Sequence, residues 1–557
     1  MFKKSNLAIY VAATLSTACL PVLSAAATDV KQQGTATNVA INKSFEPVQY
    51  STKGKPNVLV VVMDDLGYGQ LNYDNSAFDK TEFLKSLEIP KRYEANIDKA
   101  IDAAKHSTPY LRTLADNGVM LQQGFVAHGV SGPSRAAIMT SRAPSRYGIY
   151  SNDDAEKGVS LDETFLAKYF QDYGYSTAAI GKWHVSEITN VPIAKDKQTR
   201  DYHDNFVTYA NEPYQPQNRG FGYFFGYHNS GAAYYNSPSL FQNRENVQPK
   251  GYLTEQLTDQ ALKVMKNSKA DDKPFFVYLA YPAVHIPLEK MAPKKYQIFH
   301  TGNQDVDNYY ATINAVDQNV KRIMDTLKKS GQADNTMVFF LADNGAVIDS
   351  PLPMNGQFKG NKGTTWSGGV HVPMFVYWKG KLQSGLKYKN MVSSMDIMPT
   401  ALAAAGIPLP TTNKKLDGVN LLPYLNGKTQ GTPHEYLYWA QPRAFHWNAK
   451  NIPFWTNYDK FVSGQSDEYP HNPYREQDSA FTWTVRDAQW ALHYYTGNQS
   501  YELYRADDVS EQHNVAAQNP QVVTQLKQQI HGWMGQATKP ATDNNQPKYQ
   551  QLLDGMK

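Results

Sequence analysis

Pairs of oxygen-bearing side chains follow two segments of the sequence that read as buried strands. Asp64 and Asp65 come directly after the β-branched run 57–63, and Asp343 and Asn344 follow the apolar run 337–341. Side chains at the carboxyl edge of a parallel sheet can converge where the chain turns. Three carboxylates and one amide would suit a hard cation such as Ca²⁺ or Mg²⁺. An Asp-Asp pair after a strand is also common as a cap or a turn, so the residues alone leave both interpretations open.

A second group with chemical potential is the pentapeptide 131–135, Ser-Gly-Pro-Ser-Arg, which precedes the helix-forming residues 136–139. A Gly-Pro turn leading into a helix places Ser131 near the helix N-terminus, where backbone N–H groups favour anions. Arg135 lies one helical turn further and could bind an oxyanion or orient Ser131. A serine-rich turn with a capping residue would look the same, so the pentapeptide alone does not decide the chemistry.

The elements that must position these residues alternate between strand and helix. Continuous apolar runs predict buried strands at 57–63, 176–180, 275–280 and 337–341. Helical spacing and cap signals predict helices from Thr108-Pro109 to about Gly118, at 161–173 and at 308–329. This alternation predicts an α/β fold with a large mixed, mostly parallel sheet between helices.

The pattern changes after about Gly427, where Tyr, Trp, Pro and His become frequent. Short alternating segments at 481–485 and 490–495, followed by the periodic segment 522–534, predict a smaller C-terminal antiparallel sheet with a closing helix. The aromatic stretch 436–455 is either a carbohydrate-stacking surface or the core of this smaller unit. We therefore expect a signal peptide (1–27), a polar leader segment (28–55), a catalytic domain (56–427) and a C-terminal subdomain (428–557).

The first residues have the features of a secretory signal. Lys3 and Lys4 precede the apolar stretch 7–23, and Ala25-Ala26-Ala27 forms an A-x-A cleavage site. Pro21 interrupts the stretch, which is also short against the roughly 20 residues of a spanning helix. We therefore expect cleavage and export through the secretion machinery, with no membrane span.

Composition excludes several functional classes. The chain has 557 residues, 41% hydrophobic and 19% charged, with a formal net charge of +4 that falls to +2 when the signal is removed. No run of Lys and Arg suggests a nucleic-acid partner. The single cysteine, Cys19, lies within the predicted signal, so the mature chain would have no disulfide and no thiolate site. Any metal must be held by oxygen or imidazole ligands.

In combination and in order, these motifs resemble the type I sulfatase family of the alkaline-phosphatase superfamily. The resemblance spans residue 56 to the C-terminus and is closest to the periplasmic sulfatases of enterobacteria, in the serine-type (anaerobic-type) class. It rests on Asp64-Asp65, Ser-x-Pro-Ser-Arg at 131–135, Gly181-Lys182-Trp183-His184, His285, Asp343-Asn344-Gly345, Gly360-Asn361-Lys362 to Gly368-Gly369, Asp396 with Pro399-Thr400, and Tyr501-Glu502-Leu503-Tyr504. It implies an alkaline-phosphatase-like core and a periplasmic location.

The resemblance also implies roles for individual residues. Ser131 matches the residue that a radical-type maturase oxidises to Cα-formylglycine before export. The metal ligands would be Asp64, Asp65, Asp343 and Asn344, which would hold one divalent cation, with Ca²⁺ favoured over Mg²⁺ because of the exported location. Arg135 would hold the formylglycine hydrate, Lys182 and Lys362 the sulfate oxygens, and His184 and His285 would lie beside the hydrate and the leaving-group oxygen.

The implied reaction is hydrolysis of a sulfate monoester, on a small molecule or a glycan, to an alcohol and inorganic sulfate. The metal and the two lysines would neutralise the sulfate oxygens. A hydrated aldehyde has two hydroxyls: one attacks sulfur, and the other then collapses to expel sulfate. His285 would act as general acid on the departing alcohol, and His184 as base on the hydrate.

The sequence departs from the family at 367–373, which reads Ser-Gly-Gly-Val-His-Val-Pro where members usually carry Glu-Gly-Gly-x-Arg-Val-Pro. Local charge pairing is therefore expected to differ there. Two alternative functions stay open on the same scaffold. One is a phosphonate or phosphate ester hydrolase, and the other is an unmatured, non-catalytic homologue in which Ser131 is never oxidised.

Overall fold

The computed structural model of the protein describes residues 53–71, 73, 97–198, 202–288, 290–347, 350–351, 353–409, 414–442, 457, 460, 466–468 and 481–542. The predicted signal peptide lies outside these ranges, as do most of the leader segment and the 443–455 part of the aromatic stretch. Within the described ranges, no helix has the length and apolar character needed to cross a membrane.

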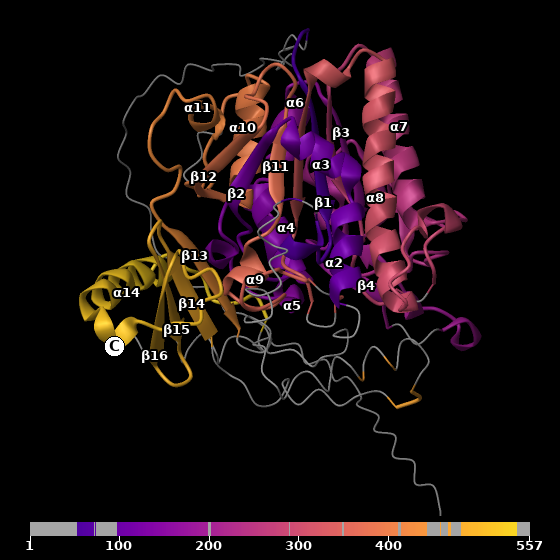
Figure 1. Ribbon diagram of the computed structural model, residues 1–557. Helices are drawn as coiled ribbons and strands as arrows, with labels where there is room; N and C mark the ends of the chain where they lie inside the picture. The colour runs from indigo at the N-terminus through magenta and orange to yellow at the C-terminus, as the bar shows by residue number, and fades with distance from the viewer. Residues whose placement is uncertain are drawn as a thin grey trace, which may run out of the picture. The chain divides into compact units, whose positions relative to one another are not determined.

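The larger part of the structure is built on a ten-stranded mixed sheet (Figure 1) with the strand order β12-β2-β11-β10-β1-β9-β3-β6-β7-β8. Neighbouring strands from β10 to β6 are all parallel, whereas β11 runs antiparallel to both β10 and β2. The strands are β1 (Asn57–Met63), β2 (Val119–Phe125), β3 (Ser176–Lys182), β6 (Tyr223–Tyr227), β7 (Leu240–Gln242), β8 (Glu245–Val247), β9 (Phe275–Ala280), β10 (Thr336–Ala342), β11 (Met374–Tyr377) and β12 (Leu386–Ser393). The predicted mixed, mostly parallel sheet is confirmed.

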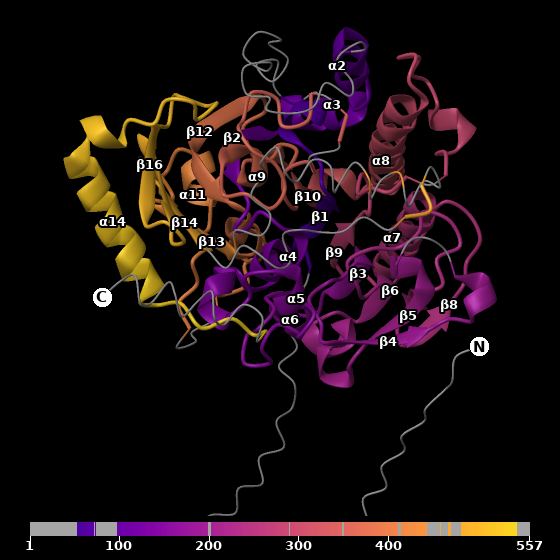
Figure 2. The same ribbon diagram turned by 90° about the horizontal axis from the view of Figure 1, so that it is seen from below.

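Helices cover both faces of this sheet, as Figure 2 shows for α7 and α8 on one side and α4 and α6 on the other. One group consists of α8 (Gln304–Lys329) and three helices that pack on it, which are α2 (Ile97–His106), α3 (Pro109–Asp116) and α7 (Leu253–Ala270). The other comprises α4 (Ser131–Thr140), α5 (Asn152–Ala155), α6 (Ala167–Asp172) and α10 (Ile397–Ala404). Shorter elements are β4 (Ile188–Pro192), β5 (Phe206–Ala210), α9 (Ser367–Val370) and α11 (Leu422–Leu425). Burial on both faces explains why β1, β9 and β10 are continuously apolar.

A separate antiparallel sheet forms near the C-terminus, with α14 packed on it (Figure 1), as the sequence predicts. Its strands are β13 (Leu437–Pro442), β14 (Phe481–Arg486), β15 (Trp490–Tyr495) and β16 (Ser500–Arg505), and α14 spans Pro520–Met534. Tyr438 stacks on Trp533 of α14 with ring centroids 4.5 Å apart, and Tyr436 packs against the same core. The described part of the aromatic stretch therefore serves core packing.

Two predicted helix boundaries were wrong. The helix predicted at 161–173 is confined to α6, because the Leu166 N–H donates to the Met139 carbonyl and the Glu163 carbonyl accepts from Arg219. These tertiary contacts replace the hydrogen bonds of a first helical turn. Helix α8 begins earlier than predicted, at Gln304, because Asn303 Oδ1 accepts hydrogen bonds from the N–H groups of Asp305 and Val306.

Candidate active site

The carboxyl ends of β1 and β10 bring together the four predicted metal ligands. These strands are parallel neighbours in which Met63 pairs with Ala342, so that Asp64 and Asp343 leave the sheet side by side. Oxygen atoms of Asp64, Asp65 and Asp343 lie within 4.8 Å of one another, and all three side chains are buried. Asn344 completes the group by donating from Nδ2 to Asp65 Oδ1 over 2.8 Å.

Ser131 is the first residue of α4 and faces this group. Its Oγ lies 3.1 Å from Asp64 Oδ1 and 3.2 Å from Asn344 Oδ1, so two of the four ligand candidates contact it directly. The following Gly132 packs closely: a Cβ at this position would lie 2.5 Å from the Ala155 Cβ of α5. The glycine therefore lets the start of α4 approach α5 and brings Ser131 to the edge of the sheet.

Three cationic side chains surround the carboxylates. Arg135 donates from NH2 to Asp343 Oδ2 over 2.8 Å and lies 3.3 Å from Asp64 Oδ1. Lys182, the last residue of β3, donates to Asp64 Oδ2 over 2.7 Å, and Lys362 lies 2.7 Å from Asp65 Oδ1. The predicted anion-binding residues therefore meet the predicted metal ligands in one buried cluster.

The charges of this cluster depend on one another. Two carboxylates within 4.8 Å of one another repel by at least about 3 kcal/mol at an effective dielectric constant of ~20. Burial alone would raise the pKa of Asp64, but Lys182 and Arg135 outweigh burial and hold the pKa below its ordinary value. Burial likewise opposes ionisation of Asp65, whose pKa is nevertheless lowered, chiefly by Lys362. The cations thus keep Asp64 and Asp65 ionised, which is the form that binds metal.

The pKa values of the two lysines are shifted in opposite directions. Burial lowers the pKa of Lys182 even though Asp64 opposes this change. Burial also acts to lower the pKa of Lys362, but Asp65 and Asp64 outweigh it and raise the pKa. Lys362 therefore remains the more firmly protonated of the two.

His184 lies two residues after the end of β3 and is buried. Neither of its ring nitrogens has a hydrogen-bond partner among the described residues, and its Nε2 lies 3.7 Å from Glu156 Oε1. Burial, together with Lys182 and Arg135, places its pKa well below the ordinary value. The imidazole is therefore neutral at pH 7 and can accept a proton.

His285 reaches the same cluster from the segment after β9. Its Nδ1 lies 2.6 Å from the Ile286 carbonyl oxygen, and because this oxygen can only accept, Nδ1 carries a hydrogen. Its Nε2 lies 3.5 Å from Asp65 Oδ2. Burial lowers the pKa of His285, although Asp65 opposes this change. All ten residues predicted for the site are thus found at one edge of the sheet.

The donor set fits a divalent metal. Three buried carboxylates and an amide oxygen from two adjacent strand ends are the hard oxygen donors that Ca²⁺ and Mg²⁺ prefer. Asp64 and Asn344 contact Ser131, Asn344 donates to Asp65, and Asp343 accepts a hydrogen bond from the N–H of Asp65. These donors do not distinguish Ca²⁺ from Mg²⁺.

Two further residues at the site were not predicted from the sequence. Asn152 accepts a hydrogen bond from the N–H of Gly132 over 3.0 Å at Oδ1, and Glu156 approaches His184. Both belong to the segment that begins with α5. Ser151 caps this short helix, and its residue type was the only local signal that could have marked the segment.

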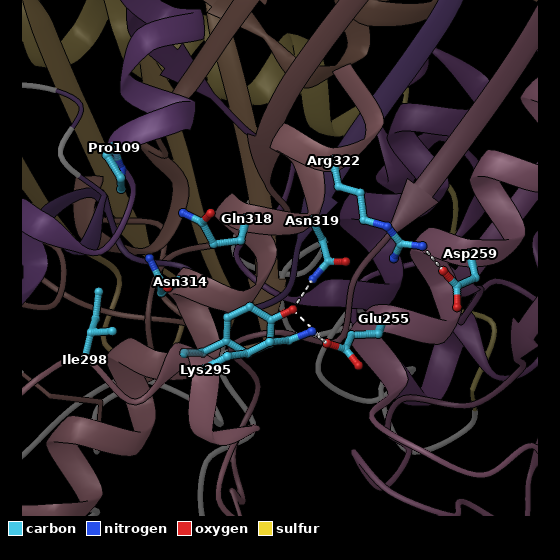
Figure 3. A pocket seen from close by; sticks show the side chains of 10 residues that line it. Pro109, Glu255, Asp259, Lys295, Ile298, Asn314, Gln318, Asn319 and Arg322 are labelled. Carbon is cyan, nitrogen blue, oxygen red and sulfur yellow. Dashed lines mark hydrogen bonds and ion pairs between the residues drawn. The ribbon is translucent and has the colours of Figure 1, made fainter. Parts of the chain in front are cut away.

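A different hollow, of about 700 Å³, lies between α3, α7, α8 and the turn at Lys294–Tyr296 (Figure 3). Its charged side chains neutralise each other: Glu255 pairs with Lys295, and Asp259 with Arg322. None of the predicted site residues lines it. We therefore assign it no part in the chemistry.

Comparisons with known proteins show which family this chain resembles. A family model described as Sulfatase matches residues 56–407. The chain is 52% identical to the "uncharacterized sulfatase YdeN" of Escherichia coli strain K12, over 99% of this chain and 98% of that protein. It is 28% identical to human steryl-sulfatase, over 71% of this chain and 74% of the relative.

Solved structures share the fold over most of their length. The structure of Ps i-CgsB in complex with k-i-k-neocarrahexaose superposes with a TM-score of 0.67 at 25% identity, covering 90% of this chain and 98% of that one. The phosphonate monoester hydrolase SpPMH from Silicibacter pomeroyi gives a TM-score of 0.56 at 18% identity, covering 88% and 97%, which shows likeness of fold alone. With a family model over more than half of its length and a relative at 52% identity, the chain belongs to the sulfatase family.

Proposed function

We propose that this protein hydrolyses a sulfate monoester to an alcohol and inorganic sulfate, with the nucleophile derived from Ser131. The observation that carries the proposal is the position of Ser131 Oγ, which contacts Asp64 and Asn344 beside the buried Arg135 and Lys182 and the partly buried Lys362. A cationic pocket next to a nucleophilic position is what attack on a sulfate ester requires, because its oxygens repel nucleophiles. Membership of the sulfatase family supports the same reaction.

Two groups that the structure does not contain belong to the proposal. A divalent cation, Ca²⁺ in preference to Mg²⁺, would be held by Asp64, Asp65, Asp343 and Asn344 and would supply positive charge to the sulfate oxygens. Oxidation of Ser131 to formylglycine, by a radical-type maturase before export, would supply an aldehyde, and addition of water to it would give the geminal diol that acts as nucleophile.

The chain's own residues hold and orient the ester. Lys182 and Lys362 would bind sulfate oxygens, since both ammonium groups already lie at carboxylates of the cluster. Arg135 is fixed by Asp343 and Asp64, so its guanidinium would orient the nucleophile without moving. The neutral imidazole of His184 would accept a proton from the nucleophile, and His285 would donate one to the departing alkoxide through Nε2 in its protonated form.

The proposal includes the substrate class and the location. Ps i-CgsB was solved in complex with the oligosaccharide k-i-k-neocarrahexaose, and steryl-sulfatase takes its name from a small-molecule ester. We include both glycan and small-molecule sulfates. Export to the periplasm through the predicted signal peptide (1–27), and the division into a catalytic domain (56–427) and a C-terminal subdomain (428–557), remain predictions.

To test the proposal, the mass of the tryptic peptide 113–135 of the mature protein is measured by mass spectrometry. The rates of hydrolysis of 4-nitrophenyl sulfate and 4-nitrophenyl phosphate are measured on the same protein. We expect a loss of two hydrogens at Ser131, trapped by a carbonyl reagent, and a higher kcat/KM on the sulfate. A higher kcat/KM on the phosphate would favour the phosphorus-ester alternative. Unmodified Ser131 together with no turnover in protein from the native host would identify a non-catalytic homologue.

A further inference from the structure

The loop from Lys359 to Ser367, here called the Lys362 loop, carries Lys362 into the site and ends at α9. On its inner side it is bound to the segment that follows β10 and to the segment before Ser131. The N–H of Lys362 donates to the Ala346 carbonyl over 2.9 Å, and the N–H of Gly363 donates to the Gly129 carbonyl over 2.7 Å. The loop thus couples the position of Lys362 to that of the nucleophile.

The outer side of the Lys362 loop is bound to the C-terminal part of the chain through Glu511. The Glu511 carboxylate accepts a hydrogen bond from the N–H of Ser367 at Oε2 over 3.0 Å, and its backbone carbonyl accepts one from Lys359 Nζ over 3.2 Å. A single residue therefore holds both ends of the loop. Figure 1 shows α9, which begins at the second of these ends, beside the strands of the small sheet.

Side chains of the small sheet keep Glu511 in place. Arg486 of β14 donates to Glu511 Oε1 over 2.9 Å and to Ser367 Oγ over 2.8 Å. His493 of β15 lies 3.4 Å from the same Oε1. Thr484 adds a hydrogen bond of 2.8 Å to Thr365 in the middle of the loop.

The residues that make these contacts are buried, so loss of a contact would leave a buried polar group without its partner. Glu511 is 1% exposed, and Ser367, Thr365 and Thr484 are each exposed by 2% or less. A buried carboxylate is costly unless it is paired and hydrogen-bonded. The arrangement therefore has one favourable geometry, in which Glu511 contacts Arg486 and Ser367 together.

We propose that Glu511 is a positioning residue for Lys362, through which the small C-terminal sheet sets the place of a sulfate-binding group. The inference rests on the proposed function, because it takes Lys362 to bind the sulfate oxygens. Glu511 contacts the loop at Lys359 and Ser367, on either side of Lys362, and acts through the backbone between them.

The test compares Glu511→Ala with Leu526→Ala in the full-length protein. Leu526 is buried in the core between α14 and the small sheet, and its removal destabilises the same subdomain without touching the Lys362 loop. Hydrogen exchange of peptides spanning 359–369 is measured for both variants, together with kcat and KM on 4-nitrophenyl sulfate. Glu511→Gln serves as the conservative variant, since its amide oxygen can still accept from Ser367.

We expect faster exchange in the loop peptides of Glu511→Ala only, and a fall of about 10-fold in kcat/KM, mainly through KM. Glu511→Gln should recover part of this loss. In a Lys362→Met background, Glu511→Ala should cause no further loss, because its effect passes through Lys362. Additive losses in this cycle, or equal exchange in Glu511→Ala and Leu526→Ala, would overturn the inference.

The two proposals fail in different ways. Absence of sulfate ester hydrolysis by wild-type protein bearing formylglycine would overturn the proposed function, and with it the role of Lys362. Hydrolysis by the wild type with unchanged loop exchange and unchanged KM in Glu511→Ala would overturn only the role of Glu511.

Discussion

The side chain of Ser131 contacts that of Asp64 across 67 positions of sequence, with Oγ 3.1 Å from Oδ1. The second oxygen of the same carboxylate accepts from Lys182 over 2.7 Å. Asp64, itself a predicted metal ligand, therefore contacts both the proposed nucleophile position and a lysine that is proposed to bind sulfate. This arrangement ties the chemistry at α4 to the ends of β1 and β3.

Replacement of Ser131 by alanine should abolish turnover of 4-nitrophenyl sulfate, because the side chain that becomes the nucleophile is removed. The free energy of unfolding should change by no more than about 1.5 kcal/mol, the net value of the hydrogen bonds lost. Steady-state kinetics and urea denaturation check both expectations. Substantial residual activity in Ser131→Ala would falsify the assignment of the nucleophile.

Removal of the metal should lower activity and stability together. The four ligand candidates join the ends of β1 and β10. A cation whose free concentration is 100 times its Kd stabilises a folded protein by about 2.7 kcal/mol. We expect exhaustive dialysis against EDTA to lower the Tm and the rate, and added Ca²⁺ to restore both. An unchanged Tm and rate after dialysis would show that these residues hold no functional cation.

Replacement of Gly181 by alanine should displace Lys182. Gly181 has a φ of +100°, and a Cβ there would lie 1.8 Å from the Ala280 carbonyl oxygen of β9. We expect a loss of about 3 kcal/mol in unfolding free energy, from overpacking and backbone strain together. The matched control is Gly222→Ala, whose Cβ would meet no atom closer than 3.6 Å. Similar denaturation midpoints for the two variants would contradict the steric argument.

The buried pair of His434 and Asp396 should make stability depend on pH. His434 Nε2 lies 2.8 Å from Asp396 Oδ1, and although burial acts to lower the pKa of His434, Asp396 outweighs it and raises the pKa. A raised folded-state pKa means that the pair stabilises fully below the unfolded pKa of about 6.5 and loses this contribution as pH rises through the folded value.

The measurement is the Tm of the wild type and of His434→Gln at about pH 5.5 and about pH 8.5. We expect the advantage of the wild type to be larger at the lower pH. An advantage that is constant or larger at the higher pH would mean that His434 is neutral in the folded protein.

Much of the site was predictable because its signals are local. The apolar run of β1 ends where Asp64 and Asp65 begin, and Ser131 lies at the N-terminus of α4, as predicted. The Gly-Pro pair that was predicted as a turn before this helix belongs to its first turn. Such features depend on a few neighbouring residues, and the order of motifs along the chain then indicates the family. Helix α7, which the sequence analysis did not predict, has a polar outer face and lacks a side-chain cap, so its boundaries carried little local signal.

The sequence alone predicted the strand-end carboxylates, the place of Ser131 near the start of a helix, and the alternation of strand and helix, since each depends on neighbouring residues. The family resemblance came from the order of such local motifs along the chain. The tertiary structure decided the strand order β10-β1-β9-β3, which places Asp343, Asp64, His285 and Lys182 at one edge, and the reversal of β11. It also decided the contact of Glu511 with Ser367, 144 positions away. Contacts of this kind depend on how whole sheets pack, and no short-range pattern of residues encodes such packing.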